Sequence, residues 1–172
     1  MDLKALVRDV PDFPKPGILF KDITPVLANP AALAWVVERF ADRYRGKVDA
    51  VVGIESRGFV VGAPVAYALG VGLALVRKAG KLPYERHAVG YQLEYGSDVL
   101  EMHVDALTAG SRVVVLDDLL ATGGTARAAI DLVGKVGARV YECAFVIELG
   151  FLLGAAKLAP APSYALIRYD ND

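Results

Sequence analysis

Short apolar runs rich in β-branched residues recur along this chain and constrain its fold more than any other feature. They are Val48 to Ile54, Arg112 to Leu116 and Val140 to Ile147. Strands that are apolar on both faces are typical of parallel sheets covered by helices. The stretches between them, Gly58 to Leu69 and Thr125 to Val136, have helical composition, so strand and helix alternate. We therefore expect an α/β fold with a doubly wound, mostly parallel sheet flanked by helices.

Two parts of the chain depart from this alternation. From Lys78 to Asp105 apolar and polar residues alternate and tyrosine and charge are frequent, which predicts a long antiparallel hairpin that protrudes from the sheet.

Near the N-terminus, Leu3 to Val10 has helical spacing, whereas the prolines and glycine of Pro11 to Gly17 predict an ordered loop or arm. Asn29 then has the character of an N-cap and Pro30 that of the first residue of an amphipathic helix.

Length and composition limit the class of protein. The 172 residues show no internal repeat or composition break, so one domain spanning residues 1–172 is expected, with Tyr164 to Arg168 as its last short strand. A formal net charge of -1 and a pI near 6.1 argue against a general nucleic-acid binder. The single cysteine, Cys143, lies in an apolar run and predicts a buried, inert thiol. We find no targeting segment and no run long enough to span a bilayer, so a cytoplasmic protein that does not bind membranes is expected.

The segment from Val113 to Thr125 carries the clearest chemical signal. Its apolar strand ends in Asp117 and Asp118, and the carboxyl ends of strands form the ligand crevice of open α/β sheets. Such carboxylates can accept hydrogen bonds from the vicinal hydroxyls of a ribose or act through a Mg²⁺ ion. The next loop supplies backbone N–H groups, two glycines and two hydroxyls at the start of a helix, which favours a dianionic phosphate. The predicted monophosphate cradle consists of Ala121, Thr122, Gly123, Gly124 and Thr125.

A plain strand-to-helix turn with Thr125 as N-cap is the alternative interpretation of this loop. The adjacent carboxylates argue against it, because two like charges at a strand end are more readily tolerated where a cation or sugar hydroxyls occupy the site. The loop is not a Walker A loop, because the glycine spacing and the Lys-Ser/Thr ending are missing. It is not a dinucleotide fingerprint either, because the carboxylates precede the glycines.

Two further clusters can bind anions. Ser56 and Arg57 follow the first predicted strand and open a helix, so backbone amides and a guanidinium can hold an anion across the crevice from the cradle. A surface ion pair between Glu55 and Arg57 is the alternative. The second cluster is basic and lies in a segment with turn chemistry, for which a solvated loop is the alternative. Its members are Arg77, Lys78 and Lys81.

Residues 113–125 resemble the phosphoribosyl pyrophosphate signature of type I phosphoribosyltransferases, in the form found in members that act on adenine. Four other segments follow the order of that family: Phe13 to Pro25, Glu55 to Phe59, Arg77 to Pro83 and Leu93 to Gly96. The resemblance therefore covers nearly the whole chain. It implies that residues 1–30 form a small N-terminal hood that receives the base and that residues 78–105 form a flexible catalytic hairpin.

The resemblance also implies roles for individual residues. Glu94 would be the acid/base that exchanges a proton with adenine, and an ordinary exposed carboxylate is the alternative. Phe20 would stack on the purine, and Lys21 stands where some relatives carry arginine, whose planar fork a lysine lacks. The base would contact Leu19, Phe20, Lys21 and Leu119. Pyrophosphate would contact Ser56, Arg57, Arg77, Lys78, Lys81 and Tyr95.

The implied reaction is displacement at the anomeric carbon of phosphoribosyl pyrophosphate by adenine, which gives AMP and pyrophosphate. Mg²⁺ would be held through the substrate and not by direct side-chain ligation, with a contribution from Asp117 and Asp118 left open. The resemblance further implies a homodimer. Two alternatives remain: an enzyme of the same fold that acts on xanthine, hypoxanthine or guanine, and a non-catalytic module that senses phosphoribosyl pyrophosphate.

Overall fold

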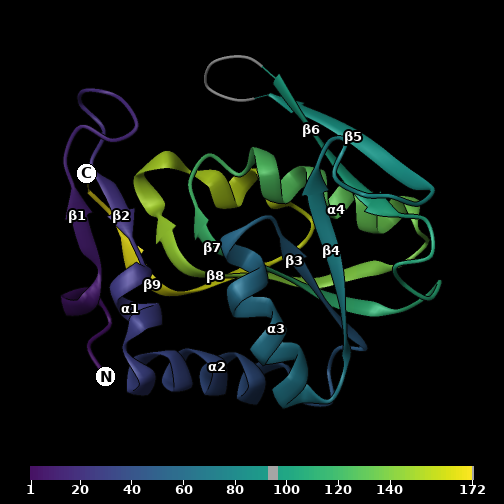
Figure 1. The fold of residues 1–172 in the computed structure, drawn as a ribbon, viewed down its shortest axis with the longest axis horizontal. Helices are drawn as coiled ribbons and strands as arrows, with labels where there is room; N and C mark the ends of the chain where they lie inside the picture. The colour runs from purple at the N-terminus through teal and green to yellow at the C-terminus, as the bar shows by residue number, and fades with distance from the viewer. Residues whose placement is uncertain (93–96, 172) are drawn as a thin grey trace.

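The computed structural model describes residues 1–92 and 97–171 (Figure 1). In this part of the chain, β1 (Arg8–Val10) and β2 (Phe20–Asp22) form a two-stranded antiparallel sheet. A seven-stranded sheet has the order β5-β6-β4-β3-β7-β8-β9. Its strands are β3 (Ala50–Ile54), β4 (Gly72–Lys78), β5 (Arg86–Gln92), β6 (Ser97–His103), β7 (Arg112–Leu120), β8 (Arg139–Leu149) and β9 (Ser163–Tyr169). The α-helices are α1 (Thr24–Ala28), α2 (Pro30–Tyr44), α3 (Arg57–Leu69) and α4 (Gly124–Lys135), and short 3₁₀ helices span Lys4–Leu6, Gly150–Leu152 and Gly154–Leu158.

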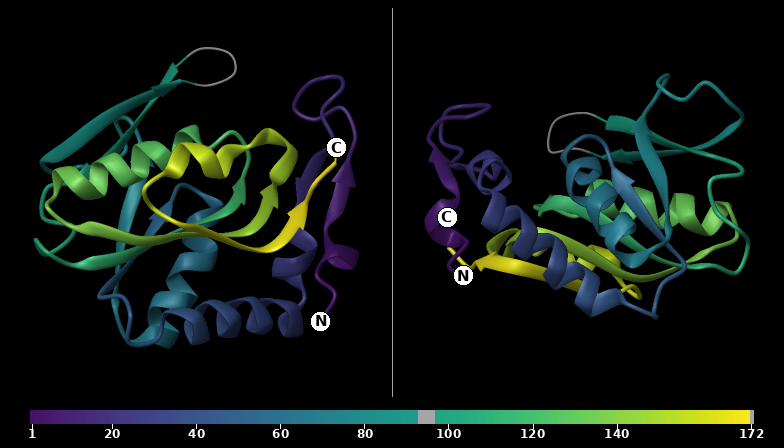
Figure 2. Two further views of the ribbon diagram at one scale, coloured as in Figure 1. Left: turned by 180° about the vertical axis from the view of Figure 1, so that it is seen from behind. Right: turned by 60° about the horizontal axis from the view of Figure 1, so that its bottom comes forward.

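The large sheet is doubly wound, as the sequence predicts. Strands β4, β3, β7, β8 and β9 run parallel, with α3 connecting β3 to β4 and α4 connecting β7 to β8. Figure 2 shows α2 and α3 on one face of the sheet and α4 on the other. Strand β7 packs Val114 and Leu116 into the core under α2 and α3, and Val113 and Val115 into the core under α4. A strand buried on both faces has to be apolar at successive positions, which explains the runs seen in the sequence.

The strand order places a topological switch point between β3 and β7. From β3 the chain moves outward to β4, whereas from β7 it moves the other way to β8 and β9. Because the two connecting helices leave on opposite faces, a crevice opens at the carboxyl ends of these two neighbouring strands. The segments that follow β3 and β7 are two of the three in which the sequence predicts anion-binding residues, and the third lies at the end of β4.

The predicted hairpin is present and continues the large sheet at its edge. Strands β5 and β6 pair antiparallel from Arg86↔His103 to Gln92↔Ser97. Strand β6 also pairs with the end of β4, at Arg77↔Glu101 and Lys78↔Leu100, which attaches the hairpin to the sheet. The hairpin leans over α4 because one face of it is apolar and packs into the core on that side (Figure 1).

The N-terminal segment differs from its prediction. The helical spacing of Leu3 to Val10 produces only one 3₁₀ turn, and the chain then becomes strand β1. Strand β1 pairs with β2 through Asp9↔Lys21, and the Lys21 ammonium donates to the Asp9 carboxylate at 2.8 Å. Pairing with a distant strand thus overrides the local helical pattern. Further on, the start of α2 is as predicted: the Asn29 side chain accepts hydrogen bonds from the first amides of the helix and Pro30 is its first residue.

Strand β7 is longer than the apolar run that predicts it. It continues to Leu120, so Asp117 and Asp118 lie inside the strand, and Asp117 is paired with Phe145 of β8. The reason is non-local, because β8 itself runs on to Leu149 and supplies main-chain partners. Cys143 is buried in β8, and burial raises the pKa of its thiol to about 12, as expected of an inert cysteine. None of the helices in residues 1–92 and 97–171 has the length and apolar character that a membrane span requires.

Candidate active site

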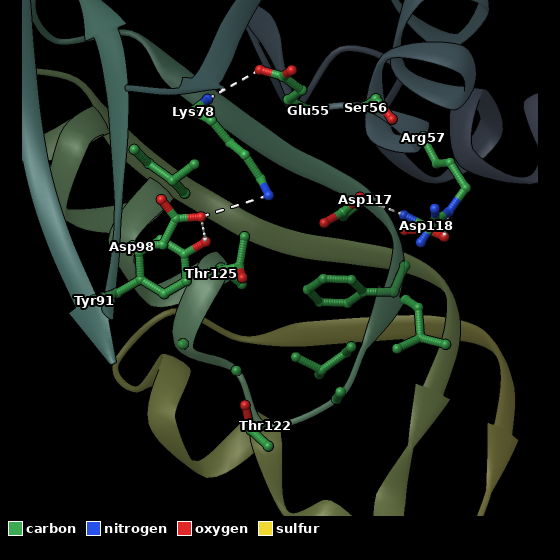
Figure 3. A pocket seen from close by; sticks show the side chains of 18 of the residues that line it. Glu55, Ser56, Arg57, Lys78, Tyr91, Asp98, Asp117, Asp118, Thr122 and Thr125 are labelled. Atoms are coloured by element: carbon green, nitrogen blue, oxygen red, sulfur yellow. Dashed lines mark hydrogen bonds and ion pairs between the residues drawn. The ribbon is translucent and has the colours of Figure 1, made fainter. Parts of the chain in front are cut away.

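A cavity of about 580 Å³ opens at the switch point (Figure 3). Its wall is built from the segment after β3, the ends of β4 and β7, the hairpin, and the first turn of α4. The structure therefore brings together elements that are far apart in sequence. The predicted site residues on this wall are Ser56, Arg57, Lys78, Lys81, Asp117, Asp118, Leu119, Ala121, Thr122, Gly123, Gly124 and Thr125.

The predicted phosphate cradle is an uncapped helix N-terminus. Gly123 is the N-cap of α4, with a φ of +83°, and it accepts from the Arg127 amide at 2.9 Å. No side chain of the described residues caps this helix, and Thr125 lies inside its first turn. The alternative interpretation with Thr125 as N-cap is therefore wrong. The first amides of α4 have no partner within the helix and face the cavity, which is the arrangement that binds phosphate.

The cradle is fixed by close backbone contacts on both sides. A Cβ added at Gly123 would lie 2.5 Å from the carbonyl oxygen of Gly154, which opens the last 3₁₀ helix. One added at Gly124 would lie 3.0 Å from the carbonyl oxygen of Gln92, at the end of β5. A side chain at Gly123 would therefore clash with the backbone, and one at Gly124 would require a small shift of its neighbour. Gly154 is a residue that the sequence prediction missed, because nothing local relates it to the cradle.

The two adjacent carboxylates have different surroundings. Asp118 is buried and forms an ion pair with Arg57 at the start of α3. Asp117 accepts a hydrogen bond from the Asp118 amide at 2.9 Å and lies next to Gly58, where a Cβ would come within 3.0 Å of its oxygen. Burial and the neighbouring Asp118 charge raise the pKa of Asp117 well above its ordinary value. Asp118 is therefore an ionised carboxylate paired with a guanidinium, whereas Asp117 binds a proton more readily than an ordinary aspartate.

Glu55 organises the predicted basic cluster, and Arg57 is not its partner. One carboxylate oxygen of Glu55 accepts from Arg77 Nε at 3.2 Å and from the Lys78 amide at 3.0 Å. The other oxygen lies 3.2 Å from Lys81 Nζ. Burial alone would raise the pKa of Glu55, yet these hydrogen bonds hold it below its ordinary value. The proposed surface pair of Glu55 with Arg57 is therefore wrong. The basic cluster forms ion pairs with Glu55, while the side chains of Lys78 and Lys81 remain 57% and 51% exposed to solvent.

Seven residues of the cavity wall were absent from the sequence prediction of the site: the apolar residues Leu100, Leu120, Ala126 and Phe145, and three polar residues. The polar residues are Glu55, Tyr91 and Asp98. Tyr91 and Asp98 face each other across the hairpin, where the Tyr91 hydroxyl lies 3.4 Å from Asp98 Oδ2 and Lys78 Nζ lies 3.6 Å from the same oxygen. The strand alternation of the hairpin is visible in the sequence. Its register, which pairs these two residues, is not.

The predicted base-binding residues divide into two groups. Leu119 lines the cavity, whereas Leu19, Phe20 and Lys21 are not among the described residues of its wall. The Phe20 ring lies 5.7 Å from the Arg57 guanidinium and so borders the site from the hood. The Lys21 side chain is buried, binds Asp9 and lies 4.5 Å from the ring centroid of Tyr169. Lys21 thus holds the hood to the C-terminal strand, and Glu94 and Tyr95 lie outside the described residues.

The sequence and fold match a known family. The model of the phosphoribosyl transferase domain matches residues 22–160, which is most of the chain. The chain belongs to the phosphoribosyltransferase family. An adenine phosphoribosyltransferase from Roseiflexus sp. (strain RS-1) is 57% identical over 169 residues, which cover 98% of each chain.

Solved structures of phosphoribosyltransferases superimpose closely. The adenine phosphoribosyltransferase of Thermoanaerobacter pseudethanolicus has a TM-score of 0.95 and 49% identity, with 98% of each chain covered. The enzyme of Saccharomyces cerevisiae, complexed with D-2,5-dideoxy-2,5-imino-altritol 1,6-bisphosphate and adenine, has a TM-score of 0.92 and 45% identity, with 96% of each chain covered.

The acidic side chains of the cavity bear on whether the site suits a metal ion. Within residues 1–92 and 97–171, no group of three or more histidine, cysteine, aspartate or glutamate side chains is arranged to hold a metal. Asp118 already binds Arg57, and the raised pKa of Asp117 makes it a weak ligand. The two carboxylates are therefore poor ligands for a metal ion bound by side chains alone.

Proposed function

We infer that the chain transfers the 5-phosphoribosyl group of phosphoribosyl pyrophosphate to adenine, with AMP and pyrophosphate as products. The main observation behind this inference is that an uncapped helix N-terminus, adjacent carboxylates and a basic cluster line the same cavity. Relatives that match nearly the full chain at about half identity or more are adenine phosphoribosyltransferases. Adenine is therefore the base, and the enzyme is a pentosyltransferase of purine salvage.

In this proposal, different residues of the cavity bind different groups of the substrate. The cradle from Ala121 to Thr125 binds the 5′-phosphate, and Asp117 and Asp118 accept hydrogen bonds from the ribose hydroxyls. Pyrophosphate binds at the start of α3 and beside the basic cluster. The residues assigned to it are Ser56, Arg57, Arg77, Lys78, Lys81 and Tyr95.

Charge accumulates on pyrophosphate as it leaves, so cations that are already ordered lower the barrier without moving far. Glu55 and Asp98 hold these cations in place before the substrate arrives. Mg²⁺ is the proposed metal. When bound with the substrate it would supply further positive charge beside the pyrophosphate, and Asp117 and Asp118 are the carboxylates of the cavity wall that could contribute to holding it. Exclusion of water by the closed hairpin protects the reaction, because water competes with adenine as nucleophile.

The purine base binds, and exchanges its proton, on the side of the ribose away from the pyrophosphate. Phe20 stacks on the purine from the hood, with the backbone of Leu19 and Lys21 reading its edge and Leu119 contacting it from β7. Glu94 exchanges a proton with the purine imidazole as the base gains or loses its bond to ribose. The position of Glu94 in the family's sequence motif supports this role.

We also propose that the enzyme acts in the cytoplasm as a homodimer. Supporting this, the outer face of α3 carries Val60 and Tyr67 at 48% and 89% exposure, seven residues apart on one side of the helix, and Leu75 of β4 is 37% exposed. Because α3 begins at the cavity with Arg57, a second copy on this face would lie close to the active site. Light scattering on wild type and Tyr67→Glu tests the dimer, which the charged variant should dissociate.

One assay tests the function. The purified chain is incubated with phosphoribosyl pyrophosphate, Mg²⁺ and one purine at a time, and the nucleotide is identified by chromatography and mass. AMP from adenine, with no nucleotide from hypoxanthine, guanine or xanthine, is the expected result. A nucleotide from another base would reassign the substrate. Binding of phosphoribosyl pyrophosphate without any nucleotide would favour a sensing module.

A further inference from the structure

The hairpin brings an aromatic side chain against the phosphate cradle. Tyr91 lies near the end of β5, and a Cβ added at Gly124 would come within 3.5 Å of its ring. Its side chain lines the cavity with Thr125 of the first turn of α4 (Figure 3). The ring therefore forms the wall of the cradle beside Gly124, whereas the carbonyl oxygen of Gly154 borders Gly123.

The Tyr91 hydroxyl points into a polar environment. It donates to Asp98 Oδ2 at 3.4 Å and also interacts with the Thr125 side chain. Hydrogen bonds between oxygen atoms usually measure about 2.5–3.0 Å, so the bond to Asp98 is a weak one that a better acceptor can replace. Burial, the first cause, and the Asp98 charge raise the pKa of Tyr91, so that the phenol keeps its proton and remains a donor.

The charges around this hydroxyl suit an incoming phosphate. The α4 amides approach the cradle from one side only, because they all point along the helix axis. On the hairpin side, Asp98 would repel a dianion, but Lys78 Nζ lies 3.6 Å from the Asp98 carboxylate and offsets its charge. A neutral O–H donor at this place can hydrogen-bond a phosphate oxygen without adding to the repulsion.

We propose that Tyr91 is a phosphate-contacting residue: with the 5′-phosphate in the cradle, its hydroxyl turns from Asp98 to donate to a phosphate oxygen. The proposal rests on the proposed function, since it concerns the monophosphate end that phosphoribosyl pyrophosphate and AMP share. It makes the hairpin part of the phosphate site in addition to its role as a cover. A tyrosine that served only to pack on Gly124 would work equally well as phenylalanine.

Tyr91→Phe tests the proposal, because it removes the hydroxyl and keeps the ring that packs on the cradle. The matched control is Tyr84→Phe, at an exposed tyrosine before β5 whose ring packs edge-on to His103. Binding of AMP and of pyrophosphate is measured by calorimetry, and steady-state kinetics give KM and kcat. Formation of AMP by the wild type is established first, so that failure of the proposed function is recognised separately.

A hydrogen bond to a charged group predicts that Tyr91→Phe weakens AMP binding about 10- to 100-fold and raises KM for phosphoribosyl pyrophosphate by a similar factor. Pyrophosphate binding and kcat should stay within about threefold of wild type, since neither depends on the monophosphate contact. Tyr84→Phe should behave as wild type. Equal AMP affinity in Tyr91→Phe and Tyr84→Phe would overturn the proposal, as would a loss confined to pyrophosphate.

Discussion

Replacing Gly154 by alanine should damage the phosphate cradle, although Gly154 is not among the described residues that line the cavity. The new Cβ would lie 2.1 Å from the carbonyl oxygen of Ala121 and 3.0 Å from the amide nitrogen of Gly123. Ordinary contact begins at 3.4 Å, so the cradle loop or the 3₁₀ helix has to move by about 1.3 Å. Both neighbours are backbone atoms, and no change of rotamer can relieve the clash.

The displacement sets the size of the effect. Overpacking of this kind typically costs about 1–3 kcal/mol of stability, and each kcal/mol lowers Tm by about 2–4 °C in a chain of this length. A shift of about 1 Å in catalytic geometry can cost about 10²-fold in rate. We therefore expect Gly154→Ala to lower Tm by several degrees and to reduce AMP affinity and kcat/KM for phosphoribosyl pyrophosphate by about 10- to 100-fold.

Thermal melts and calorimetric titration with AMP measure the two effects. The matched control is Gly134→Ala near the end of α4, where an added Cβ meets nothing within 4 Å. That variant should keep its AMP affinity and be neutral or up to about 1 kcal/mol more stable, because alanine favours the helix. A Gly154→Ala protein with the melting temperature and AMP affinity of wild type would refute the argument that this contact fixes the cradle.

Three further predictions concern the substrate-binding residues, the proposed acid/base and an ion pair of β8. Asp118→Asn and Thr125→Ala should each raise KM for phosphoribosyl pyrophosphate while the protein stays folded, and wild-type kinetics at limiting substrate in both would refute the cradle assignment. Glu94→Gln should lower kcat by about 10²- to 10⁴-fold with substrate binding within a few-fold of wild type; normal turnover would make Glu94 an ordinary carboxylate. Although burial alone would raise the pKa of Glu142, its hydrogen bonds, first that from Arg43, lower it. The ionised Glu142 stabilises the fold above its unfolded pKa of about 4.3, and this stabilisation is lost as the pH falls through the lower folded pKa. Between about pH 5 and 3, the Tm of Glu142→Gln should therefore fall less than the Tm of wild type.

The sequence by itself determined the architecture and the chemical character of the site. Apolar runs separated by helical stretches specify a parallel sheet covered on both faces, because a strand buried on both sides must be apolar at successive positions. The start of α2 was predictable because a cap involves only neighbouring residues, as the contacts of Asn29 show. The cradle of residues 121–125 is likewise a local feature, since its amides and glycines are consecutive in the chain.

Tertiary structure alone decided which side chains meet. Pairing with β8 drew Asp117 and Asp118 into β7, and pairing with β1 turned Lys21 away from Phe20 and toward Tyr169. Contacts between distant segments also pair Arg57 with Asp118 and pair Glu55 with the basic cluster. They brought Tyr91 next to Gly124 and Gly154 next to Gly123 of the cradle. The physical reason is that strand register and packing between distant segments depend on the whole chain, so a local pattern specifies which element forms but not what that element contacts.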